Sequence, residues 1–342
     1  MPKALSYGMA PRMNNMSFRI PPEWAPQAAV WAGWPRLPEE WGDAYNGAKD
    51  EIESFLKALA NVTPVKIACG SRAAYGDAHG RFGSTPNIAL HTVPSGDIWL
   101  RDTGPIYARS DKALTAHIFR FNGWGGKYVM PGDELTAGGI ASAELTARHQ
   151  HNFILEGGAI DLDGEGRLLT TRQCLLNRNR NADWTQAAAE TALREALGVR
   201  DIIWLGDGLL NDHTDGHVDN IARFIGPGLA ACQAPSGPGD PNTDTLKAIE
   251  NDLRAAGLNV ITIPSPGLIT DEDGDAVPAS HMNFLISNGH VFLPIYEAKH
   301  SARAVDALAD AMPDHNIISL PARHILSGGG SFHCMTQQVP EV

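Results

Sequence analysis

The chain has few cysteines and few cationic side chains for its length. Its 342 residues include four cysteines, Cys69, Cys174, Cys232 and Cys334, and no two of them form a C-x-x-C pair. Such isolated thiols are typical of a reducing cytoplasm and exclude a disulfide-rich scaffold. Lys and Arg number 27 against 39 Asp and Glu, which gives a formal net charge of −12. This charge argues against nucleic acid and anionic membrane surfaces as partners and suits a small cationic substrate.

Long hydrophobic runs are also missing. No segment approaches the length of a membrane span. The segment Met1–Met16 is polar and rich in Met, and it has no apolar stretch long enough for a signal peptide. No linker, low-complexity segment or long charge run divides the chain. We therefore expect one domain that spans residues 1–342 and resides in the cytoplasm.

An α/β unit recurs along the sequence, made of an amphipathic helix, a short apolar strand, a polar loop and a hairpin. Apolar residues at helical spacing predict the helices Ala73–His79, Asp133–Arg148, Trp184–Leu197, Thr243–Ala256 and Ala302–Met312. The strands that follow them are expected at Ile88–Val93, Phe153–Leu155, Ile202–Leu205, Val260–Ile263 and Ile317–Leu320. Their spacing of roughly 50–65 residues is near the period of propellers and repeat arrays.

A further helix at Ala44–Ala60 and a strand at Val65–Ala68 precede the first unit and are expected to close a ring. The sequence thus predicts an α/β protein of about five units around a pseudo-symmetric axis. The loop between strand and hairpin occupies the same place in every unit. In a closed ring these loops face one central cleft, so residues far apart in the sequence should meet there.

The first two of these loops carry acidic side chains. Asp97, Arg101 and Asp102 flank Trp99, and a carboxylate beside an aromatic wall binds a planar cation well. An Arg–Asp pair that satisfies itself within a turn is the alternative. In the next loop, Glu156 precedes two glycines and is expected to project from a strand end into the cleft, or else to lie on the surface before a turn.

The third loop contains His217 and Asp219, which are two residues apart at an expected strand start and would therefore share one face. Histidine suits proton transfer near neutral pH, and an acidic neighbour favours its protonated form. The surrounding cluster of Asp and His between Asp212 and Asp219 could instead bind a metal ion, although turn and capping roles account for Asp212 and Asp215.

Near the C-terminus, three glycines precede Cys334 in the segment Gly328–Gln338. Such a run permits backbone conformations that are closed to other residues and allows close approach of a ligand. A thiol just after it can be exposed at a pocket mouth, where a cysteine nucleophile would act on a cation bound by the acidic loops. The alternative is a buried cysteine that packs like a small hydrophobic residue.

Taken together, these segments resemble the agmatine deiminase family of the guanidine-modifying superfamily. The matching stretches are Trp34–Pro35, Trp99–Pro105, Phe121–Lys127, Glu156–Gly158, Cys174–Asn181, Thr214–Asn220, Asn283–Phe284 and Gly329–Gln338, in the order of the family. The resemblance implies the pentein fold, a five-bladed β/α propeller with pseudo-fivefold symmetry and a central active-site cleft. Arg172 and His281 depart from the family pattern, in which an acidic residue and Tyr are commoner, and the Lys127–Asp133 loop is distinctive.

The resemblance also implies residue roles. Cys334 would be the nucleophile and His217 the general acid and base, while Asp102 and Asp219 would hold the guanidinium. Glu156 would be a further acidic ligand and Trp99 a wall of the pocket.

The implied reaction is the hydrolysis of agmatine to N-carbamoylputrescine and ammonia through a covalent S-alkylthiouronium, without metal or cofactor. Peptidyl or free arginine is the alternative substrate, and a metal-dependent ureohydrolase or a non-catalytic binding module is the alternative class. A ring with exposed apolar blades also suggests a homodimer.

Overall fold

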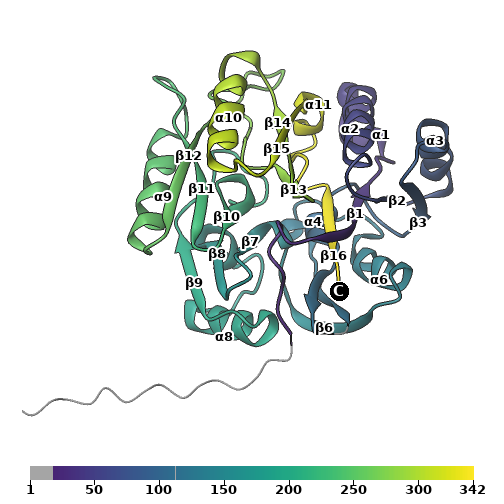
Figure 1. The fold of residues 1–342 in the computed structure, drawn as a ribbon, viewed down its shortest axis with the longest axis horizontal. Coiled ribbons are helices and arrows are strands. Elements are labelled where there is room, and N and C mark those ends of the chain that lie inside the picture. Colours follow the sequence, from purple (N-terminus) through teal and green to yellow (C-terminus); the bar gives the residue numbers. More distant parts are fainter. Residues whose placement is uncertain (1–17, 112) are drawn as a thin grey trace, which may run out of the picture.

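The structure is a computed structural model that describes residues 18–111 and 113–342. The segment Met1–Met16 lies outside the described residues. Small sheets surround a common centre, and the longer helices lie on the outside of the ring (Figure 1).

The described strands form five sheets. Four sheets have three strands each, β4 (Ile106–Arg109), β5 (Leu114–Arg120) and β6 (Ala147–Ile154); β7 (Ile160–Leu162), β8 (Arg167–Thr171) and β9 (Asp201–Leu205); β10 (Ala222–Gly226), β11 (Leu229–Ala234) and β12 (Asn259–Pro264); and β13 (Leu285–Ser287), β14 (His290–Ile295) and β15 (Asn316–Pro321). The fifth sheet contains β16 (Thr336–Pro340), β1 (Gln27–Gly33), β2 (Val65–Cys69) and β3 (Ile88–Thr92), in that order.

Each three-stranded sheet has the same topology. Its first two strands form an antiparallel hairpin, and its third strand runs parallel to the second after a helical crossover. The blade is therefore hairpin, helix and strand, because a parallel pair needs a long crossover that returns the chain to the same sheet. The sequence predicted the right elements but took the helix as the start of each unit. In the structure, the strand after a helix pairs with the preceding hairpin, and the hairpin that follows belongs to the next sheet.

The ring closes through the last described strand. β16 pairs antiparallel with β1, so that Trp31 lies opposite Gln337 and Ala32 opposite Thr336. The sequence predicted that the N-terminal helix and strand β2 close the ring. This prediction was incomplete, because β1 and β16, which form the closing pair, were not predicted as strands. The closing pair places the residues just before Thr336 at the centre of the ring (Figure 1).

The helices are α1 (Pro38–Trp41), α2 (Tyr45–Leu59), α3 (Arg72–Phe82), α4 (Leu100–Thr103), α5 (Gly123–Gly126), α6 (Asp133–Ala143), α7 (Arg172–Leu175), α8 (Gln186–Leu197), α9 (Thr243–Ala255), α10 (Ala298–Ala311) and α11 (Arg323–Leu326), with 3₁₀ turns η1 (Gly42–Ala44), η2 (Gly157–Ala159) and η3 (Val218–Asn220). Capping determines the bounds of α8. The Thr185 hydroxyl accepts a hydrogen bond from the Ala188 amide, and Gly198 ends the helix at φ +72°.

Helix α6 is shorter than predicted. It ends at Ala143, Leu145 adopts φ +53°, and strand β6 begins at Ala147. The predicted helix extended to Arg148 because no Gly or Pro marks this break in the sequence. The residues that overran the helix instead form the first part of β6, which pairs with β5.

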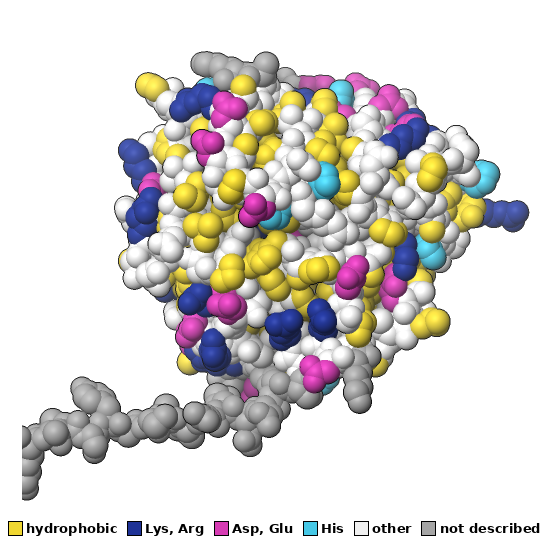
Figure 2. Space-filling model, viewed as in Figure 1, with side chains coloured by type: hydrophobic (Ala, Val, Ile, Leu, Met, Phe, Trp, Pro, Cys, Tyr) yellow, Lys and Arg dark blue, Asp and Glu magenta, His cyan; other side chains and the backbone are white. Residues whose placement is uncertain are grey.

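The apolar faces of the helices pack on the sheets. Helix α2 buries Ile52, Phe55 and Leu59 in the core, and α9 buries Ile249 and Leu253. None of the helices within the described residues is long and apolar enough to cross a membrane. On the face shown in Figure 2, acidic and basic side chains are interspersed, so the acidic excess does not gather there into one patch.

Candidate active site

The loops between consecutive blades converge at the centre of the ring, as the sequence predicted. They follow β3, β6, β9, β12 and β15 and carry Asp102, Gly158, Asp219, Asn283 and Cys334, respectively. Hydrogen bonds link the loops directly. The Gly158 amide donates to Asp102 Oδ1 at 2.9 Å, and Asn283 Nδ2 lies 2.9 Å from Cys334 Sγ.

Cys334 lies at the floor of a cavity and is 5% exposed. Its Sγ is 3.5 Å from Asp219 Oδ2, and its backbone amide donates to Asn283 Oδ1 at 3.1 Å. Burial raises the pKa of this thiol well above its usual value, and the negative charges of Asp219 and Asp102 raise it further. The thiolate that a nucleophile requires is therefore disfavoured until a cation enters.

One of the glycines before Cys334 adopts an unusual backbone conformation, and the run allows close packing, as the sequence predicted. Gly329 adopts φ +101°, which disfavours any other residue. A Cβ at Gly330 would lie 2.6 Å from the Trp99 ring and 2.9 Å from Cys334 Cβ. The run therefore lets the backbone pass between the nucleophile and the aromatic wall.

His217 is fully buried beside Asp102. Its Nδ1 is 3.7 Å from Asp102 Oδ2, and the latter oxygen also accepts a hydrogen bond from Trp124 Nε1 at 2.8 Å. Burial by itself would lower the pKa of His217, but the Asp102 charge and the thiol of Cys174 outweigh it and raise the pKa well above its usual value. Burial raises the pKa of Asp102 despite the opposing charge of His217. The raised pKa favours the protonated imidazole.

The expected placement of His217 and Asp219 on one strand face was wrong. His217 precedes the 3₁₀ turn η3, Asp219 is within it, and strand β10 begins only at Ala222. The two side chains nevertheless approach each other over Gly158. A Cβ on Gly158 would lie 2.6 Å from His217 Nδ1, 2.8 Å from Asp102 Oδ1 and 3.1 Å from Asp219 Oδ2. Only a glycine lets all three groups meet.

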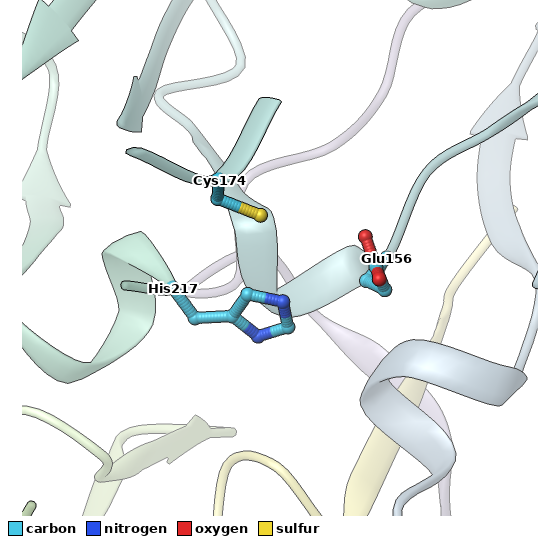
Figure 3. Close-up of side chains that lie close together, drawn as sticks. All are labelled: Glu156, Cys174 and His217. Carbon is cyan, nitrogen blue, oxygen red and sulfur yellow. The ribbon is translucent and has the colours of Figure 1, made fainter. Parts of the chain in front are cut away.

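Glu156 lies behind His217, together with Cys174 (Figure 3). The potential ligand atoms of these three side chains are within 4.8 Å of one another, and this is the one group in the described part of the chain that could hold a metal ion. Glu156 Oε1, however, accepts a hydrogen bond from Arg180 Nε at 2.6 Å, and both side chains are fully buried. Glu156 thus contacts the general-base candidate and Arg180, and it does not line the cavity.

The alternative metal cluster between Asp212 and Asp219 does not assemble. Asp212 accepts hydrogen bonds from Thr214, as the capping role predicted. Asp215 forms ion pairs with Lys127 at 2.5 Å and with Arg180 at 2.7 Å. Of the Asp and His residues between Asp212 and Asp219, only His217 belongs to the group with Glu156 and Cys174 that could hold a metal ion.

The cavity above Cys334 has a volume of about 250 Å³. Trp99, Trp124 and Tyr128 supply aromatic surface, and the acidic groups that line it are Asp102, Asp97 and Glu40. No Lys or Arg belongs to its described lining. Asp97 is 4% exposed, and burial raises its pKa to about 7 although Trp41 Nε1 donates to it at 3.3 Å.

Several residues of the site were not assigned a role from sequence. Asn283 and Trp124 lie in the matching stretches, which could have directed attention to them. His333 precedes the nucleophile, whereas Glu23 lies in a segment without any motif and reaches His333 Nε2 at 2.8 Å. Of the three departures from the family pattern, the Lys127–Asp133 loop contributes Tyr128 and Met130 to the cavity lining, whereas the other two lie away from it. Arg172 is exposed over the Trp204 ring, and His281 stacks near Tyr296.

A ring of five β/α blades with a cysteine, a histidine and paired carboxylates at its centre defines a guanidine-modifying enzyme of the pentein type. The model of the Porphyromonas-type peptidyl-arginine deiminase family matches residues 19–340. The chain is 37% identical to agmatine deiminase of Pseudomonas syringae pv. syringae (strain B728a), over 94% of its length and 95% of the relative. It therefore belongs to the agmatine deiminase family.

Solved structures agree with this assignment. The agmatine deiminase of Enterococcus faecalis superimposes with a TM-score of 0.89 at 30% identity, covering 95% of this chain and 96% of that one. A C. jejuni agmatine deiminase with substrate bound also gives a TM-score of 0.89, at 28% identity and with the same coverage. The five-bladed pentein fold expected from the sequence is confirmed.

Proposed function

We propose that this protein hydrolyses agmatine to N-carbamoylputrescine and ammonia, with Cys334 as the nucleophile and His217 as the general acid and base. The observation that carries the proposal is the convergence of this thiol, the His217 imidazole and two buried carboxylates beside one acidic cavity. Full-length relatives named agmatine deiminase support it.

The carboxylates bind and orient the guanidinium. Asp102 and Asp219 lie on the two sides of Gly158, and Asp219 Oδ1 is buried without a hydrogen-bond partner in the described structure. A planar cation that donates N–H groups to these oxygens would bring its central carbon to Cys334. Fixing both reactants in this way removes much of the entropic part of the barrier.

In the first half-reaction, the bound cation lowers the pKa of the Cys334 thiol, the thiol releases its proton to solvent, and the resulting thiolate attacks the guanidinium carbon to form a tetrahedral adduct. His217 gives its proton to the departing nitrogen, the C–N bond breaks and ammonia leaves. The raised pKa of His217 suits this role, since the group is protonated when the substrate arrives. The remaining species is an S-alkylthiouronium on Cys334.

In the second half-reaction, His217 takes a proton from water, and the resulting hydroxide adds to the same carbon. The C–S bond then breaks and restores the thiolate, the hydroxyl proton of the adduct passes to solvent, and the neutral ureido product leaves. We assign Trp99 to the wall against which the planar group lies. Glu156 acts behind His217 rather than on the substrate, since its contacts are His217 and Arg180.

The distal end of the cavity distinguishes agmatine from arginine. Asp97 and Glu40 would attract the terminal ammonium of agmatine, whereas the carboxylate of free arginine would meet these acids without a basic partner. Arg172 does not line the cavity and so does not supply that partner. Peptidyl arginine is the second candidate because the matching family model carries that description.

The test is mass spectrometry of agmatine, arginine and an arginine-ended peptide, each incubated with the protein in EDTA. We expect ammonia and the ureido product from agmatine, none of it with Cys334→Ala, and much slower turnover of the other two. Urea and putrescine that vanish in chelator would instead indicate a metal-dependent ureohydrolase. A preference for the peptide would establish the second candidate.

Finally, we propose that the chain acts as one catalytic domain in the cytoplasm, without a cofactor, and as a homodimer. The four cysteines are free and buried, which suits a reducing compartment. Light scattering in solution tests the oligomeric state.

A further inference from the structure

The residue immediately before the nucleophile lies between two carboxylates. His333 is 3% exposed, its Nδ1 is 2.7 Å from Asp219 Oδ2, and its Nε2 is 2.8 Å from Glu23 Oε2. An ionised carboxylate only accepts hydrogen bonds, so both ring nitrogens must donate. The geometry therefore requires an imidazolium, a second one in addition to His217.

This imidazolium belongs to a buried group that we call the central ion cluster, formed by Glu23, Asp161, Asp219, Arg101, Arg223 and His333. Glu23 Oε2 lies 2.9 Å from Arg223 and 3.4 Å from Arg101, and Asp161 is 3.3 Å from Arg223 Nε. Three carboxylates thus face three cations. Loss of the His333 charge would leave the carboxylates in excess, next to the thiol.

The two oxygens of Asp219 have different surroundings. Oδ2 lies 2.7 Å from His333 Nδ1, 3.4 Å from Asn283 Nδ2 and 3.5 Å from Cys334 Sγ. Oδ1 is buried and has no partner among the described residues. Burial would raise the pKa of Asp219, but the hydrogen bond and the charge of His333 outweigh it and lower the pKa. One oxygen is anchored, and the other is left to accept a hydrogen bond.

We propose that His333 is a positioning residue, which holds Asp219 ionised and oriented so that its free oxygen receives the substrate guanidinium, and that Glu23 fixes the His333 ring from the other side. The inference rests on the proposed function, because the guanidinium is the ligand that Asp219 would bind. Both ring nitrogens of His333 are engaged, by Asp219 and by Glu23. His333 therefore acts through Asp219 and not on the substrate.

The primary test measures the affinity of agmatine by calorimetry in a Cys334→Ser background, which needs no turnover. His333→Asn should weaken binding by roughly tenfold or more, since a hydrogen bond to a charged group is lost. The matched control is His117→Asn, which alters another buried histidine (2% exposed) that faces His151 and lies away from the cavity. That variant should bind agmatine as tightly as the background.

The second test uses Glu23→Gln, which retains His333 but removes the carboxylate that holds its second proton. We expect a smaller loss of agmatine affinity and a rise in KM for agmatine that exceeds any fall in kcat, because the ring is no longer fixed from the side away from Asp219. A purely structural role would lower kcat and affinity together. If His333→Asn does not fold, Glu23→Gln alone still tests the proposal.

Unchanged affinity in His333→Asn, or a fall in kcat as large as the rise in KM in Glu23→Gln, would overturn the proposal. Failure of the wild-type protein to release ammonia from agmatine would overturn the proposed function instead. The two failures are distinguishable because the binding experiment and the turnover experiment are independent.

Discussion

Arg180 Nε lies 2.6 Å from Glu156 Oε1, and neither side chain is exposed to solvent. The same guanidinium reaches Asp215 at 2.7 Å, so it joins the loop after β9 to the loop that carries Glu156. A charge without solvent depends on its partner, because burial removes the stabilisation that water would provide. The pair therefore supports the rear of the His217 pocket.

Replacement of Arg180 should destabilise the protein strongly. Arg180→Gln leaves Glu156 buried without its partner and should cost about 3–5 kcal/mol in the free energy of unfolding. Urea denaturation measures this loss. Arg178→Gln is the matched control, because Arg178 is exposed in the same loop and its replacement should have little effect. Equal losses in the two variants would contradict the role of the buried pair.

The thiol of Cys334 should react slowly in the empty site and faster when a cation is bound. Burial, Asp219 and Asp102 raise its pKa, so little thiolate exists near neutral pH. We expect a subsaturating small guanidinium to accelerate alkylation by iodoacetamide, followed by mass spectrometry. The buried thiols of Cys69 and Cys232 provide internal controls, since they should stay unmodified. A rate that guanidinium leaves unchanged or reduces, once steric blocking is controlled for, would contradict substrate-assisted activation.

A methyl group at Gly158 should abolish most of the activity. In Gly158→Ala the new Cβ would displace His217, Asp102 or Asp219, all within about 3 Å of it. Misplacement of reacting groups by about 1 Å can cost on the order of a hundredfold in rate, so kcat should fall by at least that factor. Gly206→Ala is the control, since its Cβ would meet nothing within 4 Å. Normal turnover by Gly158→Ala would show that the three groups need not meet.

The acidic end of the cavity should recognise the ammonium group of agmatine. Asp97→Asn should raise KM for agmatine by roughly tenfold or more, the value expected for a hydrogen bond to a charged group. Butylguanidine lacks the ammonium, so its KM should be the same for both proteins. Because the pKa of Asp97 is raised to about 7, KM for agmatine should also fall as the pH rises through 7 in the wild type only. Equal effects on the two substrates would place the ammonium elsewhere.

Acidification should destabilise the fold through buried histidines. Burial lowers the pKa of His281 to about 4. Burial also lowers the pKa of His117 to about 4, and the charges of His151 and His149 add to this effect. The unfolded chain takes up these protons near pH 6.5, so stability is complete above that pH and is lost as the pH falls from there through 4.

Each of these histidines should cost about 1 kcal/mol at pH 5.5 relative to pH 7.5. Urea denaturation at both pH values measures the loss. His281→Gln should make the stability less dependent on pH, whereas replacement of the exposed His79, which faces no buried histidine within the described residues, should not. An unchanged pH dependence in His281→Gln would contradict the burial effect.

Local patterns predicted the helices and the loops well. Helix α9 begins at Thr243 as expected and ends within a residue of the predicted end, because its apolar spacing is regular. The convergence of Asp102, Asp219 and Cys334 followed from the repeat, since equivalent loops of a ring must meet.

Long-range contacts were not predictable in the same way. Glu23 and His333 are 310 positions apart, and no local pattern links them. Strands β1 and β16 were likewise missed, because each completes its sheet only through a partner at the other end of the chain. The pairing of Glu156 with Arg180 depends on how two loops stack, and the sequence alone left either residue free to face solvent.

The closing strand has a consequence for how the enzyme is made. During synthesis, the ribosome releases Cys334 and β16 after the other blades have emerged, and β16 then pairs with β1. A nascent chain that stops short of this segment keeps an open ring and lacks Cys334, the nucleophile that we propose. Under the proposed mechanism, catalytic competence therefore arrives in the same step as topological closure, and a chain interrupted before Cys334 would have no turnover.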